Sequence, residues 1–427
     1  MENTYLIVTL GCKVNTYESE ALKEALENRG YKEDKNKPKV VIINTCSVTS
    51  VSDQKCRQKI RSLIKKYPNT IFVAMGCYVQ MASGYLSTIP GVDILVGTSM
   101  RSKIPDLIEE YEKNGKLIDI VSKVDKNEKY ENLGISSFHD NTRAFLKIED
   151  GCDNYCSYCV IPYARGEVRS RKKEDILLEV GRLIQNGFQE IVLTGIHTGG
   201  YGKDLDNYHF SDLLEDILKT YPSLHRLRIS SIEESEIDDK MIALMKEYPT
   251  IANHLHIPLQ SGSETVLRRM NRKYDKKAYL EKLKKIREVR PDISITTDII
   301  VGFPKESEEE FMETYEFAKA CSFSKIHVFP FSSREGTPAS KMTPQVDPTI
   351  KKERVHRLLE LSNQLEEAYE SRFIGQEIEV LFEEYDEETK INKGHTSNYL
   401  LVTVLCEKNL HNYIQKVIYQ KGLSILK

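Results

Sequence analysis

Three cysteines lie close together in the stretch "EDGCDNYCSYCVIPYARG". Cys152, Cys156 and Cys159 have the spacing C-x-x-x-C-x-x-C. Cysteine thiolates in a short loop are typical metal ligands, and a closed site of this kind uses four of them. A loop with three therefore predicts either zinc completed by a distant ligand such as His139 or His197, or a [4Fe–4S] cluster with one open iron. We favour the cluster, because nothing in the sequence marks either histidine and an open metal position is where chemistry takes place.

Three further cysteines end three apolar runs of strand length. "YLIVTLGC", "KVVIINTC" and "TIFVAMGC" end in Cys12, Cys46 and Cys77, and helical patterns lie between them. This alternation predicts parallel strands, and it places all three cysteines at the carboxyl edge of one sheet, where open α/β sheets bind ligands. One buried cysteine is usually a small hydrophobe, but three at equivalent points indicate a site. Three other cysteines are not expected to bind metal. Cys56 lacks the position at a strand end, and Cys321 and Cys406 have no partner at a metal-binding spacing.

A longer alternation of strands and helices follows. The strand-like runs are "RAFLKIEDGC", "EIVLTGI", "RLRISSI", "NHLHIPL", "ISITTDIIVGF" and "KIHVFPF". Six β-α units predict a parallel barrel or partial barrel whose reactive groups lie in the loops after the strands. The three-cysteine loop follows the first of these strands, which is where such a fold would place it.

The last part of the chain changes pattern. A charged helical stretch from Lys351 to Ser371 leads to short alternating runs, which predict a small antiparallel β-barrel. Residues 113–140 are polar and irregular and predict a linker. The fold class is therefore α/β with three domains: an open parallel α/β domain (2–115), a partial (β/α)6 barrel (138–370) and an antiparallel β-barrel (371–427).

Composition limits the class of protein. The chain has 427 residues, of which 40% are hydrophobic and 29% charged, as in soluble globular proteins. It has no basic leader and no run of roughly 18 apolar residues that could cross a membrane. Nine cysteines, an odd number, favour cytosolic thiols over a disulfide framework. We therefore expect a cytoplasmic protein with no membrane partner. The net charge of −3 does not exclude binding to nucleic acid, because the stretches "ARGEVRSRKK" and "RRMNRKY" are locally basic.

The three-cysteine loop, with Tyr158 just before its last cysteine, resembles the signature of the radical S-adenosylmethionine enzymes. The whole chain resembles the methylthiotransferases of that superfamily, through "LGCKVNTYESE", "INTCSVT", "MGCYVQ", "HIPLQSGSETVLRRMNRKY" and "TTDIIVGFPKES". The tail resembles a TRAM domain, an RNA-binding module. The resemblance implies two [4Fe–4S] clusters. The loop would hold the cluster whose open iron is chelated by S-adenosylmethionine, the source of a 5′-deoxyadenosyl radical. Cys12, Cys46 and Cys77 would hold an auxiliary cluster, where a second S-adenosylmethionine methylates sulfur.

Other residues are candidates for binding the cofactor. The glycines of "LTGIHTGGYG" let backbone approach a ligand, and Thr194 and Gly195 are our choices there. Glu233, Gln260 and Asp298 are polar groups near strand ends, where capping or holding a turn is an equally good interpretation. His254 and His256 alternate with apolar residues and are expected to be structural.

By the same resemblance the partners are tRNA, an electron donor and a sulfur source. "LGCKVNTYESE" and "PYARG" most resemble the enzymes that convert N6-threonylcarbamoyladenosine, at position 37 beside the anticodon, into its 2-methylthio derivative. The alternatives are isopentenyl-adenosine in tRNA, a ribosomal protein, or an iron–sulfur RNA-binding module without turnover, against which the open iron argues. A threonylcarbamoyl group carries a carboxylate and so predicts a cationic partner, for which Arg165 and Arg169 are candidates.

Overall fold

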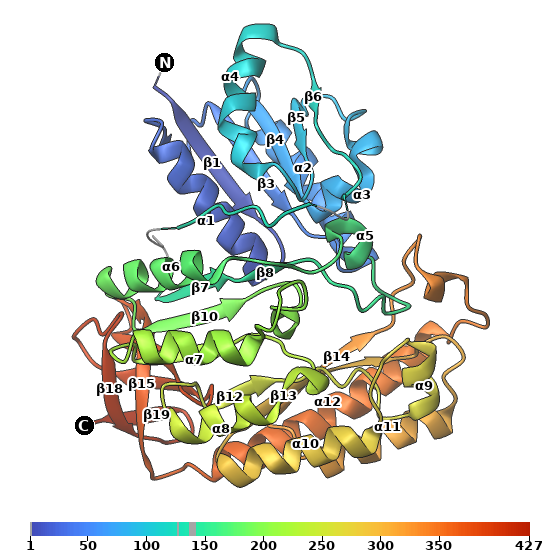
Figure 1. The fold of residues 1–427 in the computed structure, drawn as a ribbon, viewed down its shortest axis with the longest axis vertical. Coiled ribbons are helices and arrows are strands. Elements are labelled where there is room, and N and C mark those ends of the chain that lie inside the picture. Colours follow the sequence, from blue (N-terminus) through green and yellow to red (C-terminus); the bar gives the residue numbers. More distant parts are fainter. Residues whose placement is uncertain (1, 126–127, 136–141) are drawn as a thin grey trace.

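The computed structural model describes residues 2–125, 128–135 and 142–427. His139 and parts of the predicted linker lie outside these residues. The first domain stacks on the barrel, and the small β-barrel lies at the far end of the chain (Figure 1). None of the described helices is long and apolar enough to cross a membrane.

The first domain is a parallel sheet of order β2-β1-β3-β4-β5-β6. The three predicted strands are β1 (Thr4–Thr9), β3 (Val40–Thr45) and β4 (Ile71–Gly76). The structure adds β2 (Lys32–Glu33), β5 (Ile94–Val96) and β6 (Ile118–Asp119). The helices are α1 (Lys13–Glu27), α2 (Ser50–Lys66), α3 (Cys77–Leu86) and α4 (Ile104–Asn114).

Strand β3 shows why this sheet is buried on both faces. Val41 and Ile43 belong to one hydrophobic cluster, with Ile60 of α2, and Val40 and Ile42 belong to the other, with side chains of α1 and α4. Alternate residues of a strand point to opposite faces, so a run of β-branched residues suits a sheet covered by helices on both sides. This covering leaves the strand ends as the edge at which side chains from neighbouring strands can meet a ligand.

The second domain is a partial barrel of six parallel strands. Its strands are β7 (Arg143–Lys147), β10 (Glu190–Thr194), β11 (Arg226–Ile229), β12 (His254–His256), β13 (Ser294–Val301) and β14 (Lys325–Pro330). They form two three-stranded sheets, which isolated parallel bridges join between Leu227 and Ile251 and between Ser231 and His256. Within the described residues β7 and β14 do not pair, so the barrel stays open along one side. The predicted partial barrel is confirmed.

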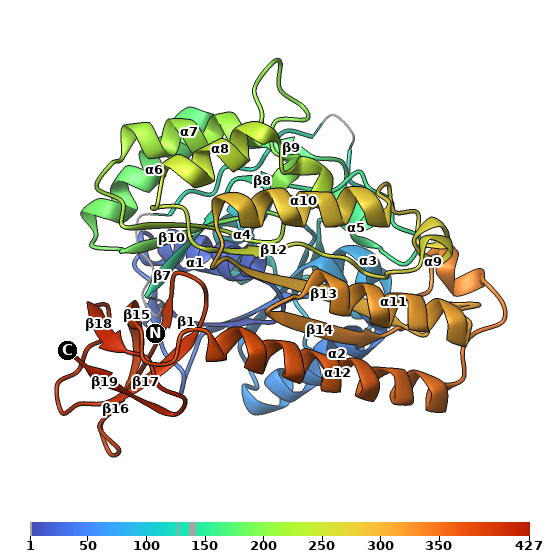
Figure 2. The same ribbon diagram turned by 90° about the horizontal axis from the view of Figure 1, so that it is seen from below.

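Helices cover the outside of this barrel (Figure 2). They are α6 (Lys173–Gln185), α7 (Phe210–Thr220), α8 (Asp239–Glu247), α10 (Lys276–Val289) and α11 (Glu308–Cys321). Two shorter helices, α5 (Ile161–Arg165) and α9 (Glu264–Arg269), lie at the carboxyl end of the strands. Two short strands, β8 (Glu149–Asp150) and β9 (Arg169–Ser170), come before and after α5 in the sequence and pair with each other. Short 3₁₀ turns occupy Arg101–Lys103, Thr198–Gly200, Glu234–Glu236 and Pro338–Lys341.

The first domain and the barrel share a core. Tyr17 and Ala21 of α1 belong to the hydrophobic cluster of the barrel, and Tyr17 is fully buried. The hydroxyl of Tyr17 accepts from Arg171 at 3.2 Å and donates to Glu179 at 3.4 Å, and both partners belong to the barrel. Helix α1 therefore fixes how the two domains meet.

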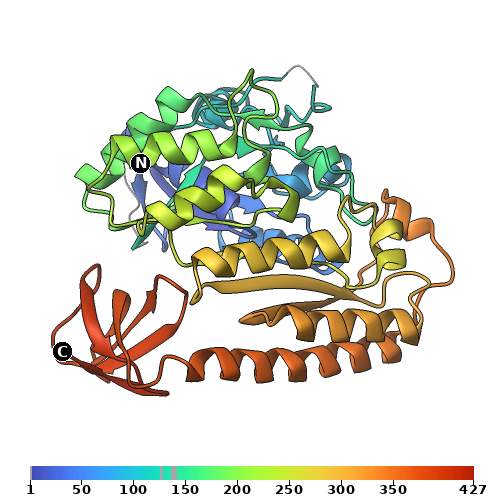
Figure 3. The ribbon, with the colours of Figure 1, turned by 60° about the horizontal axis from the view of Figure 1, so that its bottom comes forward.

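The long helix α12 (Pro348–Ser371) connects the barrel to the tail (Figure 3). The tail strands are β15 (Glu377–Asp386), β16 (Ile391–Thr396), β17 (Leu401–Leu405), β18 (Ile414–Ile418) and β19 (Leu423–Leu426), and they close in the order β15-β16-β17-β19-β18. This confirms the predicted β-barrel, although β17 and β19 pair in parallel. Arg143 donates to the hydroxyl of Tyr399 at 2.8 Å, and Arg228 to the carbonyl of Ser397 at 3.2 Å. The tail therefore closes the amino-terminal end of the larger barrel.

Candidate active site between the first domain and the barrel

The three-cysteine loop is held at the carboxyl end of the barrel strands. Cys152, Cys156 and Cys159 are all free thiols. The amide of Cys152 donates to the carbonyl of Gly166 at 2.9 Å, and the amide of Cys159 to that of Cys156 at 2.9 Å. The hydroxyl of Ser157 donates to the carbonyl of Arg269 at 2.7 Å, which ties the loop to the end of α9. The loop is therefore fixed by backbone bonds that do not depend on a metal.

Two side chains from other elements pack against this loop. Tyr158 lies edge to face on Phe303, with ring centroids 6.4 Å apart. A guanidinium nitrogen of Arg272 lies 3.5 Å from the sulfur of Cys156 and 2.9 Å from a carboxylate oxygen of Glu233. Arg272 therefore places a positive charge at one thiol of the loop while Glu233 holds the guanidinium.

The cysteines of the first domain follow three neighbouring strands, as their spacing predicts. Gly11 has a φ of +114°, and a Cβ there would lie 2.6 Å from the Cβ of Cys46. The turn that carries Cys12 therefore passes directly over Cys46, and only glycine fits. Asn15 donates to the carbonyl of Leu10 at 2.8 Å and to that of Thr45 at 3.1 Å, which joins the two loops.

Arg165 connects the two sets of cysteines. It is the last residue of α5, six positions after Cys159, and its Nε donates to the sulfur of Cys77 at 3.1 Å. Helix α5 lies against α3, which begins at Cys77 (Figure 1). The segment that carries the three-cysteine loop is therefore linked through Arg165 to Cys77 across the domain interface.

A buried network of charges surrounds Arg165. Its guanidinium lies 2.8 Å from Glu18 of α1 and 3.0 Å from Asp150, and Lys147 lies 2.9 Å and 2.6 Å from the same two carboxylates. Burial alone would raise the pKa of Glu18, but Arg101, Arg165 and Lys147 hold that pKa below its usual value. The charges come from both domains and are almost fully buried. Removing one of them would leave its partners without compensation, which costs several kcal/mol.

The guanidinium of Arg169 also points into the protein. It donates to the carbonyl of Arg165 at 2.8 Å and lies 3.9 Å from Asp150. Arg165 is fully buried and Arg169 is 8% exposed. This geometry favours a positioning role for both arginines. The exposed cations of the two basic stretches are instead Lys172, Arg268 and Lys273.

The predicted cofactor residues Thr194 and Gly195 lie beside a buried carboxyl group. Thr194 ends β10, and a Cβ on Gly195 would lie 2.1 Å from Oε1 of Glu149. Burial raises the pKa of Glu149 well above its usual value. Its Oε1 accepts from the amide of His197, while Oε2 has no hydrogen-bond partner among the described residues. Sequence reasoning missed Glu149, although an acidic pair one residue before the first cysteine of the loop was a signal.

The other polar candidates fall into two separate groups. Glu233 lines a hollow of about 210 Å³ together with Cys156, Lys203 and Lys273. Gln260 has a left-handed φ of 61°, and its amide donates to the carbonyl of Asp298 at 2.8 Å. The carboxylate of Asp298 lies 3.4 Å from Nε2 of His256. The structure therefore brings Glu233 to the cluster loop and joins Gln260 to Asp298 through the backbone.

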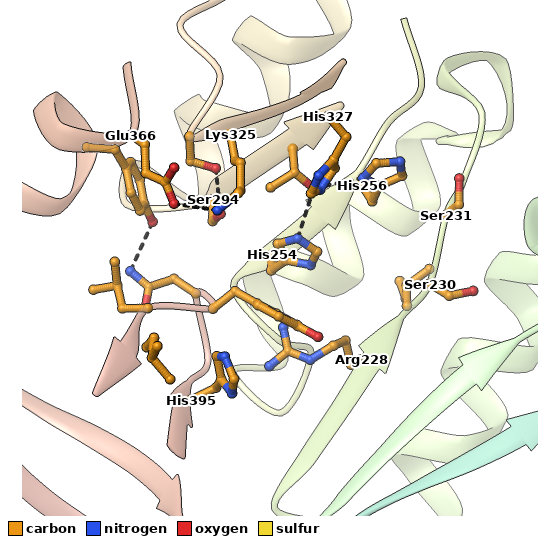
Figure 4. Close-up of a pocket in the computed structure, with 18 of the residues that line it drawn as sticks. Arg228, Ser230, Ser231, His254, His256, Ser294, Lys325, His327, Glu366 and His395 are labelled. Carbon is orange, nitrogen blue, oxygen red and sulfur yellow. Dashed lines mark hydrogen bonds and ion pairs between the residues drawn. The ribbon is translucent and has the colours of Figure 1, made fainter. Parts of the chain in front are cut away.

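A cavity of about 660 Å³ lies inside the barrel, between its strands, α12 and the tail (Figure 4). His254 and His256 line it, and both rings bond the hydroxyl of Thr296, at 3.2 Å and 2.9 Å. Burial, followed by the charge of Arg228, lowers the pKa of His254 well below its usual value. Both rings therefore have a structural bond to Thr296, as expected, and also face open space.

Comparison with known proteins identifies the family. Residues 146–318 match the radical SAM superfamily, and residues 4–97 match the uncharacterized protein family UPF0004. The threonylcarbamoyladenosine tRNA methylthiotransferase MtaB of Bacillus subtilis is 45% identical over 421 residues, covering 97% of this chain and 93% of its own length. The tRNA-2-methylthio-N(6)-dimethylallyladenosine synthase of Clostridium tetani is 36% identical over 435 residues, covering 99% and 95%.

This chain belongs to the radical S-adenosylmethionine methylthiotransferases. As a member, it uses a [4Fe–4S] cluster and S-adenosylmethionine. Its fold is shared with the radical S-adenosylmethionine methyltransferase TsrM of Kitasatospora setae, with a TM-score of 0.60 at 15% identity over 79% of this chain and 74% of the other.

The cysteines of this methylthiotransferase fit an iron–sulfur cluster. Burial raises the pKa of Cys159 to about 11 and that of Cys46 to about 12, so thiolates there require a bound cation. Among the described residues no group of three His, Cys, Asp or Glu side chains converges on a single metal ion. Nε2 of the His197 ring lies 2.5 Å from Oε1 of Glu236. Cysteine thiolates are the usual ligands of an iron–sulfur cluster, so the donor set of this loop fits one.

Proposed function

We propose that this methylthiotransferase converts N6-threonylcarbamoyladenosine at position 37 of tRNA into 2-methylthio-N6-threonylcarbamoyladenosine. The observation that carries the proposal is the contact between Arg165 and Cys77, which links the segment after the three-cysteine loop to a free cysteine of the other set. A reaction that brings a radical and a sulfur donor to one carbon needs this arrangement, because positioning both reactants removes much of the barrier. The higher identity to the threonylcarbamoyladenosine enzyme favours that substrate over dimethylallyladenosine.

In this proposal Cys152, Cys156 and Cys159 hold the radical-generating cluster, and Cys12, Cys46 and Cys77 hold an auxiliary [4Fe–4S] cluster. When bound, the clusters and S-adenosylmethionine supply a 5′-deoxyadenosyl radical and a methylated sulfur. The protein orients these groups: Arg165 donates to Cys77 and Arg272 to Cys156, so one guanidinium offsets the negative charge at each set. An electron donor and a sulfur source from outside the chain complete turnover.

The cofactor pocket of this proposal lies at the cluster loop. Oε2 of Glu149 is a buried acceptor with no partner in the described ranges of the chain, suited to the ammonium of the methionyl group. Because Gly195 has no side chain, the carboxyl group of Glu149 can lie against its backbone. Thr194 is the last residue of β10. Tyr158, Glu233, Gln260 and Asp298 complete our set of cofactor residues. Glu233 acts by holding Arg272 beside Cys156.

The tRNA would reach the site from the cytoplasm, where we place the enzyme. The TRAM-like tail and the exposed Arg268 and Lys273 beside the cluster loop are the surfaces that we assign to RNA. Cations of this kind contact phosphates and give affinity that falls with salt.

A competition experiment tests the proposed function. Reconstituted, reduced enzyme is given tRNA with the threonylcarbamoyl group, tRNA with the isopentenyl group, and the ribosomal protein, and the products are identified by mass spectrometry. We expect methylthiolation of the first substrate only. Preference for either of the others would overturn the substrate assignment, and failure to form 5′-deoxyadenosine would overturn the assignment of the cluster loop.

A further inference from the structure

The cavity inside the barrel contains a lysine from the other domain. Lys13 is the first residue of α1 and directly follows Cys12, and it lines the cavity together with residues of the barrel and the tail. It is therefore one position away from a proposed cluster ligand, and its side chain points away from the sheet edge into the barrel. One wall of the cavity is therefore formed by the residue that directly follows Cys12.

Lys13 has no direct ionic partner among the described residues. Its ammonium makes no hydrogen bond or ion pair with any of them, whereas the neighbouring Arg143 and Arg228 are held by Glu383 at 3.2 Å and by Glu190. A cation that lines a cavity without a direct partner is well placed to pair with an anionic ligand.

The cavity also offers a hydrogen-bonding group that no described residue uses. Nδ1 of His254 is buried and has no partner within the part of the chain that the structure describes, while the Nε2 of the same ring is bonded to Thr296. His254 is 8% exposed, and Figure 4 shows its ring among the side chains that surround the cavity. Unsatisfied buried polar atoms are uncommon in native structures, and a ligand that supplies the missing bond explains this one.

We propose that this cavity receives the threonylcarbamoyl group of the substrate base and that Lys13 binds its carboxylate. The inference rests on the proposed function. In the adenine ring, carbon 2 and the N6 substituent lie on either side of N1, so a base with carbon 2 at the clusters extends its substituent away from them. Lys13 directly follows the proposed cluster ligand Cys12 and lines the cavity, so it is placed to meet the substituent of such a base. An isopentenyl group has no charge or hydrogen-bonding group to match these side chains, so the same site selects against it.

In this assignment Lys13 binds the carboxylate of the threonylcarbamoyl group, in place of the earlier candidates Arg165 and Arg169. Arg165 is paired with Glu18 and Asp150, and the guanidinium of Arg169 lies on the carbonyl of Arg165. Lys13 is a cation next to a proposed cluster ligand, and it forms no ion pair with any described residue.

The test measures binding of anticodon stem-loops that differ only at position 37. The wild-type holoenzyme should bind the threonylcarbamoyl stem-loop more tightly than the unmodified one. The variant Lys13→Gln should lose about tenfold or more of this preference, as expected for a charge-assisted bond, while its affinity for the unmodified stem-loop stays the same. Lys13→Arg should restore part of the preference. Lys246→Gln, on the exposed face of α8, is the matched control and should retain all of it.

A change in the ligand tests the same contact without a variant. A stem-loop whose threonyl carboxylate is converted to the methyl ester should bind the wild-type enzyme as weakly as the natural stem-loop binds Lys13→Gln. The two changes together should cost no more than either alone, because they remove one interaction. This arm decides the question if Lys13→Gln loses iron from the neighbouring cysteines.

Two results would overturn the inference. One is an unchanged preference in Lys13→Gln and for the ester, and the other is an equal loss for both stem-loops, which would make Lys13 a phosphate contact. The proposed function fails separately, if the wild-type enzyme does not methylthiolate the threonylcarbamoyl tRNA at all.

Discussion

The two sets of cysteines are built in different ways. Cys152, Cys156 and Cys159 come from one loop, which hydrogen bonds hold to Gly166 at the end of α5 and to the end of α9. Cys12, Cys46 and Cys77 come from three strand ends and meet only when the sheet has formed. Each set has an arginine on one sulfur, but Arg272 comes from the same domain as its loop, whereas Arg165 crosses the domain interface. The loop is therefore locally determined, and the first-domain site depends on both domains.

The largest effect should come from the loop. Replacing Cys152, Cys156 and Cys159 together by Ala should abolish formation of 5′-deoxyadenosine and reduce iron from about eight to about four per chain, assuming two cubane clusters. The first-domain cysteines are not touched by the change and keep their sheet. Iron analysis and chromatography of the nucleoside products measure both effects. Loss of all iron would show that the two sites are not independent.

Replacing Cys12, Cys46 and Cys77 together by Ala should have a narrower effect. Cleavage of S-adenosylmethionine should continue, because the loop keeps its own hydrogen bonds, while methylthiolated tRNA should disappear. Mass spectrometry of the tRNA separates the two half-reactions. Full methylthiolation by this variant would remove the first-domain cysteines from the sulfur-bearing role.

The arginines sharpen the comparison further. Arg165→Met should destabilise the protein by about 3 kcal/mol, because it leaves the buried Glu18 and Asp150 with fewer partners. Arg29→Met is the matched control, since its ion pairs with Asp106 and Glu109 are exposed and contribute little. Thermal unfolding of the two variants under the same conditions gives the difference.

A second readout separates an electrostatic role of Arg165 from a purely structural one. Losing a donor to the sulfur of Cys77 should lower the reduction potential of the auxiliary cluster and leave that of the radical cluster unchanged. Redox titration followed by electron paramagnetic resonance measures both. Equal shifts at the two clusters, or none at either, would contradict a local role for this contact.

The smallest effect should come from the other cysteines. Cys56 lies beside the first-domain site, but its thiol donates to the carbonyl of Cys46 at 3.2 Å, a bond that serine can replace. Cys321 is buried in the barrel core, and Cys406 packs in the tail. Changing any one of them to Ser should leave the iron content unchanged. A drop in iron for Cys56→Ser would make it part of the site.

The sequence predicted the elements well because their patterns are local. The run "VVIINT" is buried on both faces and became β3, and six strand-like runs became the six strands of the barrel. The alternating runs of the tail became its closed β-barrel. Short edge strands such as β2 and β6 were missed, because two residues carry no periodic signal. Glu149 was missed as a site residue for a related reason: its burial against Gly195 is a long-range contact.

By itself the sequence determined the fold class, the two sets of cysteines and the chemistry that their thiols allow, because residue type and local spacing decide these features. Only the tertiary structure decided which charges are free. Arg165 follows the cluster loop and looked available, yet two carboxylates 132 residues apart in the sequence, Glu18 and Asp150, enclose it. Lys13 gave no such signal, yet packing of α1 against β7 places it in the barrel cavity, where it forms no ion pair with any described residue. Pairing of buried charges depends on contacts between distant segments, and no local pattern encodes them.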